Sequence, residues 1–182
     1  MTIEPRSFLY TLAAAATVFS ISFAVARAAE PATLLGVTKD WSAFTSGSGS
    51  SKICYTLSKP TATEPKAAKR DPIYFIITDW PGRKPKTKSE PEAVPGYQYK
   101  DGTTVTAQVG GAKFEMFAKN DAGAGAAWVR ERADELRMIE AMKRAKQLVV
   151  TGTSQRGTLT HDTYSLAGLS DSLNKIHDAC GM

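Results

Sequence analysis

The stretch Ile73-Tyr-Phe-Ile-Ile-Thr78 decides the fold class, because apolar and aromatic residues fill its first five consecutive positions. A short apolar run of this kind is typical of a strand that is covered on both faces. Further strand-like segments flank it, separated by Gly-, Ser- and Pro-rich stretches. The sequence therefore predicts a mainly β fold with residues 73–78 as a central strand.

Three hairpins are predicted around this strand. The most specific one turns at Gly110-Gly111, since glycine at both turn positions permits the positive φ angles of a tight hairpin. The strands paired in hairpins are 41–45 with 52–58, 103–109 with 113–117, and 147–153 with 158–166. Between the first hairpin and the central strand, residues 60–71 are polar and are expected to form an exposed connection.

Two segments have helical character. Residues 126–146 contain no Gly or Pro and are rich in Ala, Glu, Arg, Leu and Met, which favour helix. Glu140 and Arg144 have the spacing of a helical ion pair. The second predicted helix spans 170–180, with Ser170 as its N-cap.

The N-terminus has the three parts of a secretory signal. Arg6 gives a weakly basic start, an apolar run of eighteen residues spans 8–25, and Ala26-Arg-Ala28 is a small-x-small cleavage site. We predict a signal peptide at 1–28 and a soluble mature domain at 29–182. The alternative is an uncleaved N-terminal anchor, because a run of this length nearly spans a bilayer.

The predicted mature chain is mildly basic. It carries 21 basic and 17 acidic residues, because the signal segment holds two of the 23 basic and one of the 18 acidic residues. This balance favours anionic surfaces but lacks the clustering of a nucleic-acid-binding protein. A chain of about 150 residues is enough for one domain. No nucleic acid is expected among its partners.

The predicted C-terminal helix directs Cys180 toward the body of the protein. Leu169, Leu173, Ile176 and Cys180 follow one another at i, i+4, i+7 and i+11. At 100° per residue, Leu169 and Cys180 differ by only about 20° around the helix axis. Cys180 is therefore expected to point in the same direction as this apolar stripe.

Cys54, the other cysteine, lies in a predicted strand. It alternates with Ile53, Tyr55 and Leu57, so it faces outward if those three side chains face the core. We predict that the terminal helix lies on the outer face of this strand, fixed by a disulfide between Cys54 and Cys180. Export favours this disulfide over the alternative, two unpaired buried thiols.

The sequence contains no recognisable catalytic or metal-binding pattern. His161 precedes Asp162 in a strand, so their side chains leave opposite faces, and His177 lies on the side of its helix away from the stripe. Both are interpreted as ordinary surface histidines. Residues 152–157 resemble a nucleophile elbow but are one residue too long. We predict no catalytic residue, no metal and no cofactor, and therefore no enzyme.

The basic loop, residues 82–88, is the one concentration of charge. It is a candidate surface contact with lipopolysaccharide, anionic lipid or a host polyanion. The alternative is a solvated loop held extended by prolines, because two glutamates follow it and reduce the local field. The candidate contact residues are Trp80, Arg83, Lys84, Lys86 and Lys88.

Taken in order, these segments resemble the invasion-associated locus B family, exported proteins of alphaproteobacteria. The resemblance covers nearly all of residues 33–181, and the order and spacing of its motifs carry it, since no single motif is diagnostic. The matching stretches are Asp40-Trp-Ser-Ala-Phe44, Lys52-Ile-Cys-Tyr-Thr-Leu-Ser-Lys-Pro60, Arg70-Asp-Pro-Ile-Tyr-Phe75, Ala112-Lys-Phe-Glu-Met-Phe117, Ala127-Trp128, Met138-Ile-Glu-Ala-Met-Lys143, Gly152-Thr-Ser-Gln-Arg-Gly157, Asp162-Thr-Tyr-Ser-Leu-Ala-Gly-Leu169 and Cys180.

The resemblance implies an immunoglobulin-like β-sandwich, here with helices at about 126–146 and 170–180, and a periplasmic or outer-envelope location. The family name refers to host-cell invasion. Its biochemical activity is not established, so no catalytic residue is carried over. The segment before Gly96 is usually apolar in the family, whereas here it holds Pro91 and Pro95. We therefore expect a shortened or edge strand there.

The expected function is that of an exported periplasmic or outer-envelope protein acting non-enzymatically through protein or cell-surface contacts, with a role in host interaction. The alternative is a periplasmic small-ligand binder or hydrolase with an unrecognised site. A deep concave site with converging carboxylates or His161 would favour that alternative. An inhibitor or chaperone-like factor is a third class, which the sequence does not separate from the first.

Overall fold

The computed structural model describes residues 30–66, 68–121 and 123–182. The predicted signal segment lies outside these residues. Eleven antiparallel strands form one open sheet in the order β1-β2-β3-β5-β6-β9-β8-β7-β10-β11-β4. The strands are β1 (Thr33–Thr38), β2 (Trp41–Ser46), β3 (Ile53–Ser58), β4 (Ala62–Glu64), β5 (Tyr74–Trp80), β6 (Thr87–Val94), β7 (Val105–Val109), β8 (Ala112–Asp121), β9 (Ala124–Val129), β10 (Gln147–Thr153) and β11 (Leu159–Ser165). A 3₁₀ turn, η1 (Gly49–Ser51), and two helices, α1 (Arg132–Arg144) and α2 (Leu169–Cys180), complete the described chain.

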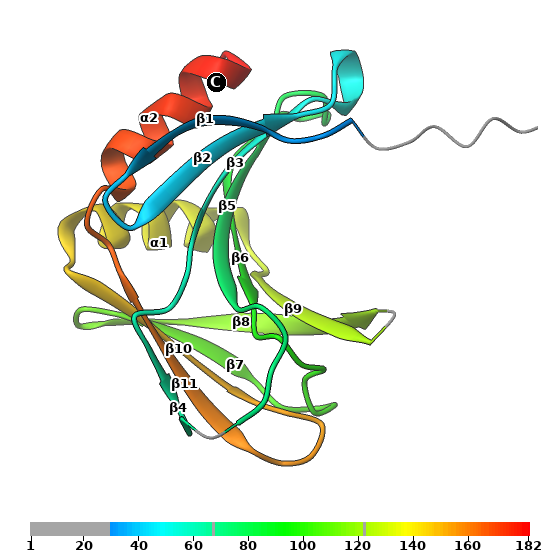
Figure 1. Ribbon diagram of the computed structural model, residues 1–182, viewed down its shortest axis with the longest axis vertical. Helices are drawn as coiled ribbons and strands as arrows, with labels where there is room; N and C mark the ends of the chain where they lie inside the picture. Colours follow the sequence, from blue (N-terminus) through cyan, green and yellow to red (C-terminus); the bar gives the residue numbers. More distant parts are fainter. Residues whose placement is uncertain (1–29, 67, 122) are drawn as a thin grey trace, which may run out of the picture.

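The mainly β class is confirmed, but a separate two-sheet, immunoglobulin-like sandwich is not shown. The sheet is continuous and bends sharply where β6 meets β9, so that the strands on either side run in very different directions (Figure 1). Only two residue pairs, Glu92 with Trp128 and Ala93 with Ala127, join the strands there. This β6–β9 seam joins two groups of strands, from β1 to β6 and from β9 to β4 in sheet order, into one sheet.

Both helices lie on the same side of the sheet, which we call the inner face (Figure 1). Helix α2 contacts β1, β2, β3 and β5, whereas α1 contacts β6 to β9. The bend brings β2 and β5 close to β11 on this side. The Phe75 and Tyr164 rings are 5.7 Å apart, and the Trp41 indole N–H donates a hydrogen bond to the Ser165 carbonyl. The core therefore fills the inner face.

The predicted central strand is confirmed as β5, which lies between β3 and β6. Phe75 and Ile77 are fully buried on its inner face, whereas Tyr74 and Ile76 are half-buried on the opposite, outer face. The strand begins one residue later than predicted and continues through Trp80. The predicted hairpins β2–β3, β7–β8 and β10–β11 are also present.

The predicted helix at 126–146 is wrong in its first part. Residues 124–129 form strand β9, and α1 begins only at Arg132. The local composition favours helix. This segment is nevertheless a strand, because it pairs with β8 and β6 and because the Trp128 ring contacts the Phe117 ring. The predicted Glu140–Arg144 ion pair is long, 3.9 Å, because Lys143 lies closer to the same carboxylate, at 2.8 Å.

The expectation of a shortened or edge strand before Gly96 is also wrong. Strand β6 has eight residues and lies inside the sheet between β5 and β9. Pro91 faces Ile77 of β5 and precedes the two residues that pair with β9, and Pro95 follows the end of the strand. The prolines therefore interrupt no hydrogen-bonded pairing across the seam.

The C-terminal helix is confirmed, but Ser170 is not its cap. The N-cap is Gly168, which has a φ of +89° and precedes the first helical residue, Leu169. A Cβ atom at Gly168 would lie 2.1 Å from the Thr38 carbonyl oxygen. Glycine is therefore required both by the backbone conformation and by the close approach of β1.

Most described residues of the connection at 60–71 are exposed, as predicted, but part of the connection packs against the sheet. It contains strand β4, which pairs with β11. Its Arg70 side chain is nearly buried and forms a two-bond ion pair with buried Asp162, and the guanidinium lies 5.5 Å from the centre of the Tyr97 ring. This pair ties the connection to the inner face of β11.

Candidate functional site

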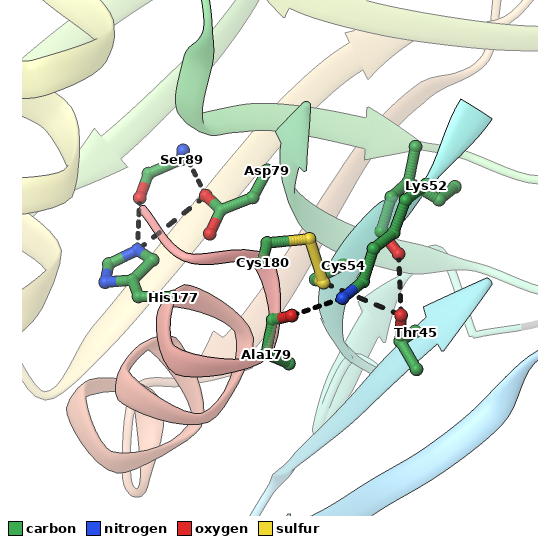
Figure 2. Close-up of a disulfide and its surroundings, with 9 residues drawn as sticks. Thr45, Lys52, Cys54, Asp79, Ser89, His177, Ala179 and Cys180 are labelled. Carbon is green, nitrogen blue, oxygen red and sulfur yellow. Dashed lines mark hydrogen bonds and ion pairs between the residues drawn. A yellow bond between two sulfur atoms is a disulfide. The ribbon is translucent and has the colours of Figure 1, made fainter. Parts of the chain in front are cut away.

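Helix α2 is fixed to the inner face of β3. Cys54 and Cys180 form the predicted disulfide, with their Cα atoms 5.9 Å apart. The Lys52 ammonium donates a hydrogen bond to the Ala179 carbonyl beside it (Figure 2). Nearer the start of α2, about two turns before Cys180, the buried hydroxyls of Ser172 and Thr56 lie 2.6 Å apart. We call this set of contacts the α2 clasp.

The orientation of Cys54 was predicted correctly only in part. The helix does lie on the Cys54 face of β3, as expected. This face is the buried one: Cys54 is fully buried, while Ile53, Tyr55 and Leu57 are half-buried on the outer face. Leu169, Leu173, Ile176 and Cys180 are buried, as the helical stripe predicts.

A polar cluster beside the clasp joins α2 to β5 and β6. The His177 Nε2 atom lies 2.9 Å from the Ser89 Oγ atom and 3.8 Å from the Asp79 Oδ1 atom. The Ser89 backbone N–H donates to the same Asp79 oxygen over 2.7 Å (Figure 2). His177 was predicted to be a surface residue, but its side chain is only 15% exposed. That prediction is wrong because His177 faces the sheet, where Asp79 shares the inner face of β5 with Phe75 and Ile77 and Ser89 lies at a bulge in β6.

The cluster contains Ser, His and Asp but lacks the geometry of a catalytic triad. In a triad, serine and aspartate occupy different nitrogens of the imidazole. Here the Ser89 and Asp79 oxygens both approach Nε2. Ser89 is 3% exposed and has a φ of +58°. Its hydroxyl faces the interior, and the arrangement serves to anchor α2.

Burial shifts the two titratable groups of this cluster in opposite senses. It raises the pKa of Asp79 to about 6, although the Ser89 N–H and the charges of Lys88 and Arg132 act to lower it. Burial lowers the pKa of His177 to about 4, and Lys88 and Lys143 add to this effect. At neutral pH the imidazole is therefore neutral and Asp79 is ionised.

The structure separates the residues predicted to form one basic surface. The Arg83 guanidinium stacks on the Trp80 ring, 4.0 Å from its centre, and pairs with Glu90 over 2.7 Å. The Trp80 indole N–H donates to the other oxygen of the same carboxylate. Lys88 is half-buried and close enough to Asp79 and His177 to affect their pKa values. Both residues therefore have contacts within the protein, although the Arg83 side chain is still 45% exposed.

Lys84 and Lys86 line an open groove of about 520 Å³ between the basic loop and the 3₁₀ turn η1. Arg83, Lys52 and the clasp residue Cys180 also line it, and no carboxylate does. The loop is held against η1 at Gly82, where a Cβ atom would lie 2.0 Å from the Ser50 carbonyl oxygen. We call this hollow the basic groove.

Lys52 is the groove residue that sequence reasoning missed. It is thirty-two residues from Lys84 in the chain, and the two meet only because β3 and β5 are neighbours. Glu90, one of the two glutamates that follow the basic loop, does more than reduce the local field, because it binds Arg83 directly. No sequence pattern signals either contact.

Another hollow, of about 810 Å³, lies elsewhere, between the loop at 100–104, β8 and the start of α1. Acidic and basic side chains alternate around it, and Arg137 pairs with Asp134. His161 does not line it. That histidine is half-buried on β11 and lies 2.9 Å from the Thr151 hydroxyl. Within the described ranges, no group of His, Cys, Asp and Glu has the arrangement of a metal site.

Comparison with solved structures identifies a similar fold. The crystal structure of invasion associated protein b from Bartonella henselae aligns with a TM-score of 0.55 over 81% of this chain and 98% of that chain, at 14% sequence identity. The resemblance expected from the sequence is thus confirmed at the level of the fold. No protein-family model matches the chain. No curated protein matches it either. In the part of the chain that is described, no helix has the length and apolar character needed to cross a membrane.

Proposed function

We propose that this chain is an exported protein of the bacterial periplasm or outer envelope, and that it acts through contacts with proteins or surfaces rather than by catalysis. Its fold is similar to that of invasion associated protein b, and its one disulfide is of the kind that persists in oxidising compartments. A role in host interaction follows from the family resemblance and is part of the proposal.

The basic groove is the observation that carries the contact site. Lys84 and Lys86 are exposed, and no salt bridge to either forms among the described residues. Prolines 81 and 85 provide apolar surface beside these cations. A groove with several cations and no carboxylate favours an anionic partner. We propose that the groove binds anionic groups on an envelope or host surface.

Crosslinking in intact envelopes, followed by affinity capture of the chain, tests this site. We expect the variant K84A/K86A to lose crosslinked partners that the wild-type chain retains, and increasing salt to weaken the same contacts. The matched control is K113A/K119A, which removes two exposed lysines of β8 far from the groove. Unchanged partners in K84A/K86A would reject the groove as the contact site.

Cell fractionation tests the location independently of the groove. We expect the chain in the periplasmic or envelope fraction, with Ala29 as the first residue of the mature protein. Recovery of the full-length chain in the cytoplasm, with both cysteines reduced, would contradict export.

A further inference from the structure

The outer face of the sheet, opposite the helices, carries two rows of side chains that cross adjacent strands. Residues paired in a sheet project from the same face, so the strand registers place them directly. The first row spans seven strands from Val37 to Phe117, and the second spans five strands from Leu34 to Glu90. In strand order they are Val37, Ser42, Leu57, Ile76, Glu92, Trp128 and Phe117, then Leu34, Phe44, Tyr55, Thr78 and Glu90. We call both rows together the outer stripe.

Most of the outer stripe is apolar, and neither helix covers it (Figure 1). Leu34 is 53% exposed and Val37 is 62% exposed, two of the four large hydrophobic side chains that are well exposed in the described chain. Phe44 and Tyr55 stack with their ring centres 5.2 Å apart. A mainly apolar stripe of this kind is unusual on the solvent face of an antiparallel sheet, which normally carries polar residues.

The stripe contains two carboxylates, both on β6. Glu90 is neutralised by Arg83 and receives the Trp80 N–H. Glu92 lies between Ile76 and Trp128, and within the described residues it forms no salt bridge. Burial, with the nearby charge of Glu90, raises the pKa of Glu92. A half-buried carboxylate without a cation is a costly feature for a free surface.

The protein's own arginines show how this face accommodates a cation. Arg83 stacks on Trp80 while it pairs with Glu90, and the Arg130 guanidinium lies 4.8 Å from the centre of the Phe117 ring. Glu92 and Trp128 offer the same combination of a carboxylate and an aromatic ring between these two sites.

We propose that the outer stripe is a docking face for a partner polypeptide, whose apolar side chains lie along the two rows and whose lysine or arginine reaches Glu92. Charge complementarity identifies this occupant. A second copy placed face to face would set a second Glu92 carboxylate against the first, and an anionic membrane would bring no cation to Glu92. This face is distinct from the basic groove, so the inference does not depend on the proposed anionic partner.

Site-specific photo-crosslinking in intact envelopes tests the inference. A benzophenone amino acid replaces Phe44 in the stripe or, as the control position, exposed Gln108 on β7. We expect a polypeptide crosslink at position 44 only, with its contact mapped next to a lysine or arginine of the partner. Glu92→Lys is expected to reduce the yield roughly tenfold or more, because it leaves like charges opposed. Glu115→Lys, a charge reversal at an exposed site on β8, is expected to leave the yield unchanged.

Thermal unfolding of each variant confirms that it is folded, and Glu92→Gln, which keeps the side-chain shape, replaces Glu92→Lys if the latter unfolds. The inference is overturned if the yield does not depend on residue 92, if position 44 crosslinks only to lipid or to a second copy, or if it crosslinks no more than position 108. Mapping to a segment without a basic residue would also reject it.

Discussion

The α2 clasp and the β6–β9 seam are two junctions of the same fold, and different kinds of interaction hold them together. The clasp combines a disulfide, a buried hydroxyl pair and an apolar helical stripe. The seam has two backbone residue pairs, one of them between two alanines. The clasp is held by side chains and a covalent bond, whereas the seam depends on close packing of small residues. Mutation should therefore affect the two junctions through different physical causes.

Loss of the disulfide is expected to have the largest effect. The bond joins residues 126 positions apart, so its removal restores considerable freedom to the unfolded chain. We expect C54A/C180A to lower the free energy of unfolding by about 2–5 kcal/mol. Denaturant unfolding of the variant, compared with wild type with and without reductant, measures this. Reduced wild type should match the variant, and a loss below about 0.5 kcal/mol would contradict the importance of the bond.

The polar cluster at the clasp predicts opposing pH responses. The pKa of Asp79 is raised from 3.8 to about 6, so its contribution to stability is full at low pH and is lost as pH rises between those values. The pKa of His177 is lowered from 6.5 to about 4, so its contribution is full above pH 6.5 and is lost as pH falls toward 4. The two effects partly cancel in the wild-type protein.

Single variants separate these responses. Between pH 6.5 and 4, Asp79→Asn leaves the His177 response and should lose stability relative to wild type, by roughly 2 kcal/mol. His177→Gln leaves the Asp79 response and should gain stability relative to wild type by a similar amount over the same range. Urea unfolding at a series of pH values measures both. Changes of the same sign in the two variants would refute the assignment.

The seam should respond to added volume instead. Ala127 is fully buried on the inner face, so Ala127→Leu is expected to destabilise the fold by about 1–3 kcal/mol through overpacking. Ala126 precedes it on the half-buried outer face, and Ala126→Leu serves as the control. Thermal unfolding compares the two, and equal shifts in Tm would show that the seam is not closely packed.

The buried hydroxyl pair of the clasp should give the smallest effect. Thr56→Val leaves the buried Ser172 hydroxyl without its partner, at a cost of about 1–2 kcal/mol. Removing both hydroxyls, in T56V/S172A, should cost less than the sum of the two single variants. A double-mutant cycle measures this coupling, and strict additivity would indicate that the two hydroxyls do not interact.

The same contrast explains what the sequence could predict. The helical spacing of Leu169, Leu173, Ile176 and Cys180 is a local pattern, and it predicted both the helix and the direction in which Cys180 points. Strand β9 has an Ala-rich sequence that favours helix, and only its neighbours β6 and β8 make it a strand. The position of β6 inside the sheet was missed for the same reason, because its prolines avoid the seam in a way that only the register reveals.

The sequence likewise predicted only part of the candidate site. The basic loop is evident in the sequence, and Lys84 and Lys86 do line a groove. The burial of His177 and the contribution of Lys52 depend on contacts between segments distant in the chain, whereas Arg83 is held by its near neighbours Trp80 and Glu90. Charge patterning locates a basic segment but does not determine which of its cations stay free.

Hydrogen exchange on the reduced and oxidised protein tests most directly the claim that α2 is held to the sheet by its clasp. With the disulfide intact, the amides of α2 should be protected to the same degree as those of β5. After reduction, we expect α2 to lose protection while β10 and β11 retain theirs, because local opening of the helix no longer stretches a covalent bond. Undiminished protection of α2 in the reduced protein would contradict the account.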